Sequence, residues 1–121
     1  MAEDKPGVVL LPWYATGFRA DRLEPALARI AAVALRYGAT QYSVYRSRGD
    51  SYKFIHLSHF NSRLDWERYW YGPEMSQFRA DYSSWYQVPI VYEWQDLVAA
   101  DVIEPEPVAE AEEPLTAESA S

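Results

Sequence analysis

Residues 39–60 decide the fold of this 121-residue chain, and they read Ala-Thr-Gln-Tyr-Ser-Val-Tyr-Arg-Ser-Arg-Gly-Asp-Ser-Tyr-Lys-Phe-Ile-His-Leu-Ser-His-Phe. Residues 39–47 are rich in Thr, Tyr and Val, which favour strands. Residues 52–60 are likewise rich in residues that favour strands, so both segments are predicted to be extended. Between them, Arg48-Gly49-Asp50-Ser51 is typical of a hairpin turn. The stretch therefore predicts two antiparallel strands joined by a short turn.

The segments before this hairpin predict a strand and a helix. The apolar run from Val8 to Tyr14 is continuous, so it predicts a strand that is buried on both faces. Apolar residues then recur at helical spacing from about Asp21 to Tyr37, with Pro25 in the first turn and Gly38 at the C-terminal cap.

The segments after the hairpin predict two helical pieces and a last strand. Asn61-Ser62 opens a helix that Gly72-Pro73 breaks, and a second piece runs from Pro73 to about Tyr86. Residues 88–95 predict the fourth strand, and Pro89 places it at a sheet edge. The order β-α-β-β-α-β predicts an α+β, ferredoxin-like fold: an antiparallel sheet with both helices on one face.

The other face of this sheet is left uncovered. The pleat assigns Tyr42, Val44, Ile55 and Leu57 to the helix side. The uncovered side then receives a semi-polar, aromatic set: Ser43, Tyr45, Phe54, His56 and Ser58. Monomers rarely expose a large contiguous apolar patch. We therefore expect a homodimer that closes this face, with the two sheets forming a dimeric α/β barrel.

Ten aromatic rings lie in the 29 residues from Trp66 to Trp94. Many of them carry a hydroxyl or an indole N–H, which needs a partner when it is buried. Such a concentration indicates a lined cavity or a partner-facing surface.

Charge divides the chain at residue 100. Seven of the 18 acids and none of the 11 bases follow residue 100, so residues 1–100 hold eleven of each and are neutral. We expect one domain over 1–100 and a disordered acidic tail over 101–121. A neutral body argues against nucleic acid as a partner. The polar start and the short apolar run after it predict a cytoplasmic protein with no membrane partner.

The runs Arg36–Asp50 and Tyr52–Trp70 resemble the antibiotic-biosynthesis-monooxygenase-like branch of the dimeric α/β-barrel superfamily. Their shared features are a helix that ends in Gly, a strand of the form Tyr-x-Val-Tyr-Arg-Ser, an Asp-containing turn and an Asn-Ser helix start followed by Trp. The resemblance implies a dimeric barrel and, among several activities, cofactor-independent quinone-forming monooxygenation. Haem degraders of this superfamily place a histidine on a helix, whereas both histidines here lie on a strand. No cofactor is expected.

The resemblance also implies site residues. Asn61 and Trp66 resemble the asparagine and tryptophan with which the cofactor-free oxygenases bind and deprotonate a phenolic substrate. Tyr69, Tyr71 and Arg79 could supply the neighbouring groups. The same residues also have plain structural interpretations, in which Asn61 caps a helix and Trp66 packs beneath it.

The remaining candidates come from the residues themselves. His56, on the uncovered face, could serve as a general base. His56 and His59 point to opposite faces of one strand, so a shared metal ion is not expected. Further rings that could line a ligand site are Tyr45, Phe54, Trp70 and Trp94.

Two functions follow from these observations, and the residues argue against a third. The first is a dimeric small-molecule-binding protein, with monooxygenase-type chemistry on an aromatic or polyketide-like substrate. The second is a non-catalytic dimeric module that binds a protein through its aromatic surface or its acidic tail. An RNA-recognition motif shares the element order, but the neutral body, the first strand and the broken second helix argue against it. A ring-lined cavity with Asn61 and Trp66 turned inward favours the enzyme, and a filled core favours the module.

Overall fold

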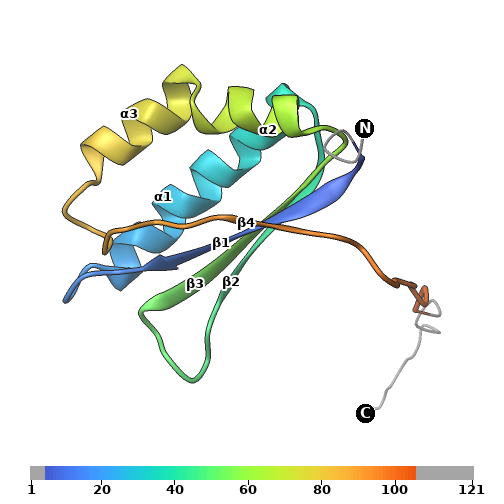
Figure 1. Cartoon of the computed structure of the whole chain (residues 1–121). Coiled ribbons are helices and arrows are strands. Elements are labelled where there is room, and N and C mark those ends of the chain that lie inside the picture. Colours follow the sequence, from blue (N-terminus) through green and yellow to red (C-terminus); the bar gives the residue numbers. More distant parts are fainter. Residues whose placement is uncertain (1–4, 106–121) are drawn as a thin grey trace, which may run out of the picture.

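One four-stranded antiparallel sheet carries the helices on one side and leaves its other side open (Figure 1). The computed structural model describes residues 5–105. The strands are β1 (Gly7–Tyr14), β2 (Ala39–Arg46), β3 (Lys53–Phe60) and β4 (Glu93–Gln95), in the sheet order β2-β3-β1-β4. The predicted α+β, ferredoxin-like fold class is therefore confirmed.

Local signals place the helix ends close to where the sequence predicts them. The helices are α1 (Ala20–Val33), the 3-10 helix η2 (Ala34–Tyr37), α2 (Arg63–Trp70) and α3 (Pro73–Asp81). Gly38 follows η2 with a φ of 103°, which glycine adopts without strain. The Ser62 hydroxyl accepts the backbone N–H of Asp65 and so caps α2. Gly72 and Pro73 separate α2 from α3.

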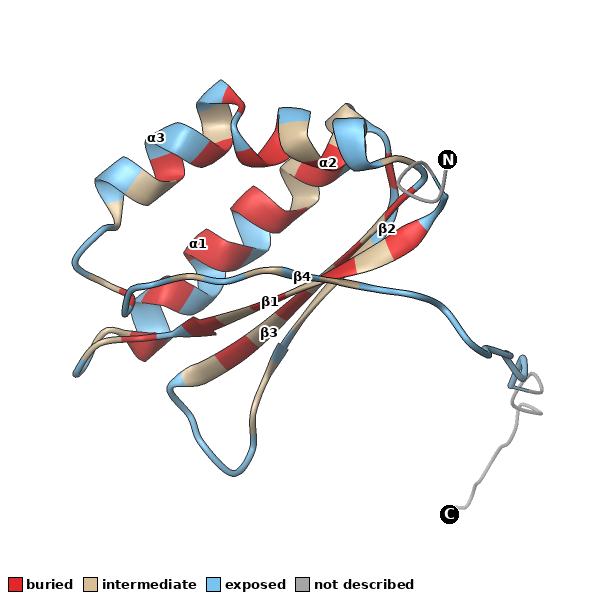
Figure 2. Cartoon of the chain, in the orientation of Figure 1, coloured by how far each residue is buried: buried red, intermediate tan, exposed pale blue. Residues whose placement is uncertain are grey.

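Burial along β1 and β3 alternates strictly, so each strand has one face in the core (Figure 2). On β1 the buried residues are Val9, Leu11 and Trp13, whereas Val8, Leu10 and Pro12 are partly exposed. The prediction that the first strand is buried on both faces is therefore wrong for the single chain. The apolar residues on its outer side are the reason for that prediction, and they are left half-covered.

On β3 the predicted assignment of faces is reversed. Phe54, His56 and Ser58 lie buried on the helix side, and Ile55 and Leu57 lie on the open side. The pairing of Val44 with His56 and of Tyr45 with Ile55 fixes this register, because directly paired residues share a face. The assignments of Tyr42, Val44, Ser43 and Tyr45 on β2 are confirmed by the same pairing.

The physical reason for the reversal is that the polar residues of β3 satisfy one another inside the core. The Trp13 indole Nε1–H donates to His56 Nδ1 at 3.3 Å, and His56 Nε2 lies 3.3 Å from the Ser58 hydroxyl. Buried polar groups are tolerated when they are hydrogen-bonded. The open face consequently carries the aliphatic set: Val8, Leu10, Pro12, Ile55 and Leu57, together with Ser43, Tyr45 and His59.

The last strand is shorter than predicted. It contains only Glu93–Gln95, and residues 88–92 lie outside the ladder of backbone hydrogen bonds. In a β-strand, every second residue directs its N–H and C=O groups to the same side. The Tyr14 carbonyl accepts the Gln87 N–H on the β4 side of β1, so residue 12 also directs its backbone groups to that side. Pro12 has no N–H to donate there. The edge position that Pro89 indicates is confirmed.

Helix α3 also ends earlier than predicted, at Asp81 rather than near Tyr86. The carbonyl of Ser84 accepts hydrogen bonds from Thr16 Oγ1 at 2.8 Å and from Arg19 at 3.2 Å. These bonds hold residues 82–86 against the loop between β1 and α1, which is incompatible with a continuing helix. Met75 and Phe78 on α3 are buried, and Tyr82 and Trp85 after it pack against the core.

Two further observations concern membrane spans and the predicted tail. Within residues 5–105, no helix has the length and apolar character needed to cross a membrane. Of the predicted tail, residues 101–105 are exposed, and residues 106–121 lie outside the described residues.

Candidate functional site

Between the sheet and helices α2 and α3 lies a continuous group of aromatic side chains, here called the ring cluster. Its members are Trp13, Phe60, Trp66, Tyr69, Trp70, Phe78, Tyr86 and Tyr92. Trp70 is at its centre, stacked on Trp66 at 5.4 Å between centroids and tilted against Trp13 at 6.4 Å. The edge-to-face and offset contacts are those that aromatic pairs prefer. The rings thus pack on one another between the sheet and helices α2 and α3.

Trp66 has an unsatisfied polar group inside this cluster. Its side chain is 1% exposed, and it packs edge-to-face against Phe60 and Tyr92 at 5.7 and 5.0 Å. Its indole Nε1 is buried and has no hydrogen-bond partner among the residues that the structure describes. A buried donor without an acceptor is destabilising by about 1–3 kcal/mol. An oxygen of a bound molecule would remove that penalty.

His56 is fixed in one neutral form by its neighbours. Burial lowers the pKa of His56 to about 4, so the ring is neutral at pH 7. An indole N–H can only donate, so Nδ1 is the acceptor from Trp13 and the ring proton lies on Nε2, which donates to Ser58. The lone pair that a general base would use is therefore occupied. The prediction that His56 faces the uncovered side is wrong, and its observed contacts are those of a core histidine.

Arg79 lies at the border of the ring cluster. Its guanidinium sits 4.2 Å from the centroid of the Trp70 ring and donates to the Trp70 carbonyl at 2.9 Å. The Tyr86 hydroxyl donates to the Arg79 carbonyl at 3.1 Å; burial raises the pKa of Tyr86, and the charge of Arg79 opposes that rise. No carboxylate within residues 5–105 forms an ion pair with Arg79. A cation held over an indole in this way retains donors for an anionic oxygen.

The other predicted site residues are not brought to one place. Tyr69 packs against Trp66 and donates to the Ile30 carbonyl at 2.7 Å, and burial raises its pKa. Phe54 is fully buried beneath Arg46, and Trp94 packs against Gly7. Tyr45 and Tyr71 are 59% and 66% exposed, on the open face and beside the α2–α3 break respectively.

Asn61 is exposed, and Ser62 rather than Asn61 caps α2. It lines a small hollow of about 110 Å³ together with His59, Phe60 and Leu97. Trp66, by contrast, is buried in the ring cluster, where it packs edge-to-face against Phe60. The structure therefore joins Trp66, Tyr69, Trp70 and Arg79 and separates Asn61 from them.

Sequence reasoning missed Trp13 and Tyr92 as parts of the site. Tyr92 covers both Trp66 and Trp70 from the segment that precedes β4. The available signal for Trp13 was an aromatic residue on the first strand in phase with Val9 and Leu11. Its hydrogen bond to His56 could not be read from spacing, because 43 residues separate the two.

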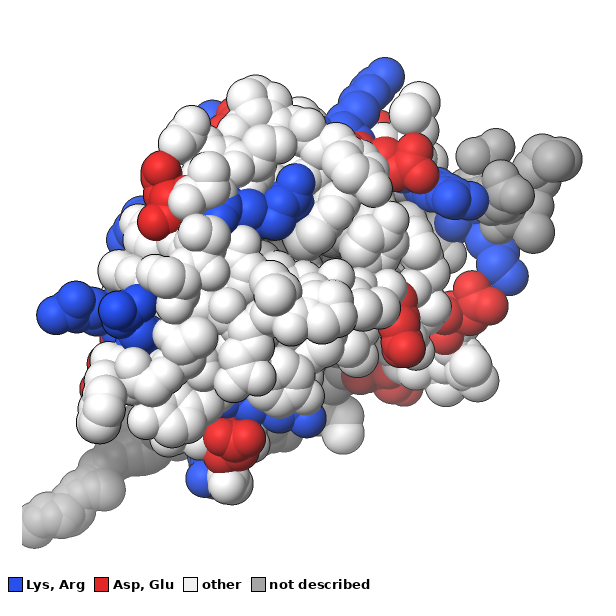
Figure 3. All heavy atoms as spheres, turned by 60° about the vertical axis from the view of Figure 1, so that its left-hand side comes forward, with Lys and Arg blue, Asp and Glu red and all other residues white. Residues whose placement is uncertain are grey.

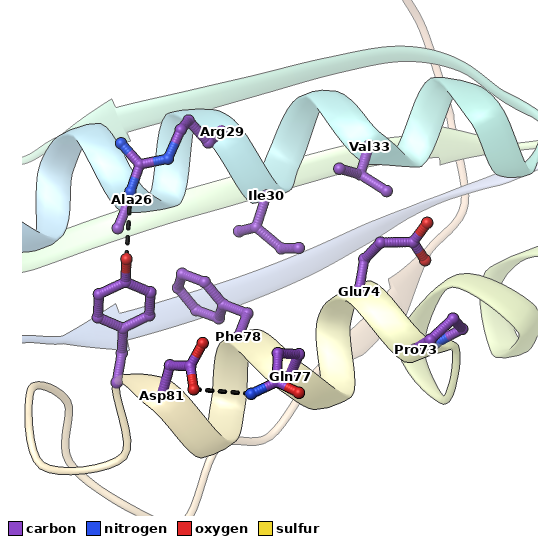
Figure 4. A pocket seen from close by; sticks show the side chains of 10 residues that line it. Ala26, Arg29, Ile30, Val33, Pro73, Glu74, Gln77, Phe78 and Asp81 are labelled. Carbon is purple, nitrogen blue, oxygen red and sulfur yellow. Dashed lines mark hydrogen bonds between the residues drawn. The ribbon is translucent and has the colours of Figure 1, made fainter.

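A larger, shallower groove of about 560 Å³ lies between α1 and α3 (Figure 4). Its floor is formed by Ala26, Ile30 and Phe78, which are themselves buried. The polar groups along its rim are already paired, because Arg29 donates to the Tyr82 hydroxyl and Gln77 to Asp81. None of the predicted site residues lines this groove.

Charge is sparse on the face of the molecule that Figure 3 shows. Its centre is uncharged and hollowed beside a basic side chain, and basic and acidic residues are scattered along the margin. Within residues 5–105 there is no group of three His, Asp or Glu side chains that could hold a metal ion.

Comparisons with known proteins agree on the fold. No protein-family model and no curated protein matches the sequence. Among solved structures, PA3566 from Pseudomonas aeruginosa is similar, with a TM-score of 0.70 and 19% identity over 80% of this chain and 98% of that one. A candidate antibiotic biosynthesis monooxygenase from Nitrosomonas europaea has a TM-score of 0.70 and 12% identity, over 78% and 92% of the two chains.

A third similar structure is SnoaB, a cofactor-independent oxygenase from Streptomyces nogalater, with a TM-score of 0.64 and 14% identity over 84% of this chain and 99% of that one. At these identities the likeness concerns the fold. The chain has the fold of the antibiotic-biosynthesis-monooxygenase-like proteins, as the motifs in residues 36–70 indicate.

Proposed function

We propose that this protein is a homodimeric α/β barrel that binds an aromatic, polyketide-like molecule at the Trp66 end of the ring cluster and oxidises it without a cofactor. One observation carries the proposal: the Trp66 indole N–H is buried among flat rings and has no acceptor within residues 5–105. A phenolate or quinone oxygen is the acceptor that such a donor suits, and a planar molecule suits the neighbouring rings. SnoaB, whose fold this chain shares, is a cofactor-independent oxygenase.

Entry to this site would pass beneath the segment that carries Tyr92. Residues 88–92 lie outside the sheet ladder, yet Ile90 and Tyr92 pack on the core. Displacing Tyr92 would uncover both Trp66 and Trp70 without breaking a strand. Arg79, on the far side of Trp70, would then receive an anionic oxygen of the substrate.

The proposed reaction is balanced by the substrate and O₂ alone. An anthrone loses the two hydrogens of its CH₂ group; one oxygen atom of O₂ becomes the new quinone carbonyl, and the other leaves with those hydrogens as water. The substrate supplies the electrons, so no flavin, haem or metal is required. The protein would favour the anionic form of the substrate by donating to its oxygen, with Trp66 and Arg79 as the donors in the ring cluster and Asn61 as a further donor in the exposed turn between β3 and α2.

The dimer belongs to the same proposal. The open sheet face has aliphatic residues on its central strands, including Leu10, Ile55 and Leu57. A second copy packed against it would bury about 1,600 Å² or more, which is usual for a stable dimer.

A non-catalytic dimeric module is the second candidate, and the packing of the rings favours it. Trp13 and Phe54 have no exposed surface, and Trp66 has almost none. If the cluster never opens, it serves only as a core, and the binding surface lies elsewhere.

The test uses 1,8-dihydroxyanthrone as the probe with the wild type, Trp66→Phe and Trp85→Phe. The wild type should show quenched tryptophan fluorescence, a raised Tm, O₂ uptake and formation of the quinone. Trp66→Phe keeps an aromatic ring but removes the N–H, so binding should weaken by about tenfold. Trp85→Phe is the matched control, because Trp85 packs on Tyr82, outside the ring cluster, and its replacement should change neither the binding of the anthrone nor its conversion. A wild type that neither binds nor converts the anthrone would replace the enzyme proposal with the module.

A further inference from the structure

Helix α1 and the 3-10 helix η2 carry a row of arginines on the outer surface of the domain. Arg22 and Arg29 are both exposed, and they are seven residues apart on α1, so they lie on the same face of the helix. Arg36, in η2, is exposed as well. These three residues, here called the arginine row, extend over about 20 Å.

The acids of α1 do not neutralise the arginine row. Asp21 and Glu24 both form ion pairs with Arg46 on β2, at 3.0 and 2.8 Å. Arg29 donates to the uncharged Tyr82 hydroxyl at 3.2 Å. None of the three arginines of the row forms an ion pair within residues 5–105. The positive charge on this surface is therefore not balanced by an ion pair in the described part of the chain.

The chain carries its excess of acids at the C-terminal end. Residues 106–121, here called the terminal segment, contain no base and five acids: Glu106, Glu110, Glu112, Glu113 and Glu118. Fully extended, a segment of this length spans about 53 Å. A domain of about 100 residues has a radius of gyration of only about 13 Å. The terminal segment is therefore long enough to reach α1 of its own chain.

We propose that the terminal segment docks on the arginine row of its own chain. Opposite charges at a surface attract one another within a Debye length, which is about 10 Å at 0.1 M salt. Tethering favours this occupant over a separate acidic molecule, because a linked segment is present at an effective concentration in the millimolar range. The contact is independent of the ring cluster and holds whether or not that cluster binds a ligand.

The groove beside the arginine row favours the same placement. Arg29 belongs to the α1 wall of the groove between α1 and α3, whose floor is apolar (Figure 4). In the terminal segment, Val108 and Leu115 flank the glutamates at 110–113. A segment that lies along α1 pairs its glutamates with the row and places an apolar side chain over the groove. Glu74 and Asp81 belong to the opposite wall, on α3, so repulsion between like charges keeps the segment on the α1 side.

The test uses the full-length chain with Ala117→Cys and a nitroxide label on that residue. The chain contains no cysteine of its own, so the label has one position. At low salt, the NMR amide signals of Arg22, Arg29 and Arg36 should be at least about twofold weaker than after reduction of the nitroxide. In about 1 M salt, where the Debye length is about 3 Å, this loss of intensity should disappear.

Two labelled triple variants show whether charge is the cause. Arg22→Gln/Arg29→Gln/Arg36→Gln removes the arginine row, so its α1 and η2 signals should keep their full intensity. The matched control removes as many positive charges from the hairpin, β3 and α2, and it should retain the loss of intensity: Arg48→Gln/Lys53→Gln/Arg68→Gln.

Three results would overturn the inference. Full intensity of the α1 and η2 signals in the labelled wild-type background at low salt means that the terminal segment does not dock there. Equal losses in the two triple variants mean that the arginine row is not the docking surface. A mixture of isotope-labelled chains without nitroxide and nitroxide-labelled chains without isotope should show no loss, and a loss in that mixture places the segment on a second copy.

Discussion

The two faces of β3 differ in a way opposite to simple expectation. Its helix-side face carries His56 and Ser58 and is buried, whereas its other face carries Ile55 and Leu57 and is partly exposed. The buried polar groups are stable because Trp13, His56 and Ser58 form a closed set of hydrogen bonds. The aliphatic groups on the other face stay partly exposed within residues 5–105. The polar groups on the inner face of β3 are therefore satisfied within the single chain, and the aliphatic outer face is the one that we propose a second copy covers.

The largest expected effect comes from removing a large ring that packs on the helix side of the sheet. Trp13→Ala removes contacts with Trp70, Phe78 and Tyr86 and leaves the His56 acceptor unpaired. The free energy of unfolding, measured with urea, should fall by about 3–5 kcal/mol. The control is Tyr71→Ala, an exposed ring, which should stay within about 0.5 kcal/mol of the wild type. Equal losses for the two variants would contradict a core role for Trp13.

Lowering the pH should destabilise the folded chain through His56, on the helix-side face of β3. Burial lowers the pKa of His56 from 6.5 to about 4, so between these values the unfolded chain binds a proton that the folded chain does not. The free energy of unfolding should therefore fall as the pH drops from 6.5 to 4, by about 3 kcal/mol in total, and this contribution should level off below pH 4.

The matched variants for this pH dependence are His56→Gln and His59→Gln. His56→Gln should flatten the slope between pH 6.5 and 4, whereas His59→Gln on the open face should retain it. Denaturation curves at several pH values measure both. A slope unchanged in His56→Gln would show that another group titrates.

The outer face should respond to charge without unfolding. Leu57→Asp places a carboxylate at the centre of the proposed dimer face. The dimer should weaken by about 2 kcal/mol or more, while the circular dichroism spectrum stays native. Leu64→Asp, on α2, should leave the dimer intact. Dimers of equal strength in both variants would mean that the open face is not the contact.

A smaller effect separates Asn61 from its neighbour. Ser62 caps α2, so Ser62→Ala should lower the free energy of unfolding by about 1 kcal/mol. Asn61→Ala should change it by less than about 0.5 kcal/mol, because Asn61 is exposed and does not cap the helix. Under the proposed function, Asn61→Ala should nevertheless lower anthrone turnover. A variant that loses stability but keeps its turnover would assign Asn61 a structural role.

The element order and the helix boundaries other than the end of α3 could be predicted because they depend on local signals. Gly38, Ser62 and the Gly72-Pro73 pair mark the boundaries in the sequence itself. The face of β3 could not be predicted in this way, since each side of Lys53–Phe60 carries two apolar residues: Ile55 and Leu57 on one, Phe54 and Phe60 on the other. The hydrogen bond that decides the phase joins residues 43 positions apart. The length of β4 likewise depends on Pro12, which belongs to a distant strand.

The candidate site was predictable only in part, for a related reason. Trp66, Tyr69 and Trp70 follow from one helix, so their proximity to one another is local. Tyr92 joins them through tertiary packing, and Asn61 is exposed whereas Trp66 is buried. Neither position could be predicted from the spacing of residues in the sequence.

The most direct test of the account is sedimentation equilibrium of the full-length wild type at micromolar concentration. If the open face is covered by a second copy, the mass should be twice the 14.0 kDa of one chain. The Leu57→Asp variant should sediment at the mass of a single chain in the same run. A wild type that remains a single chain at these concentrations would contradict the account.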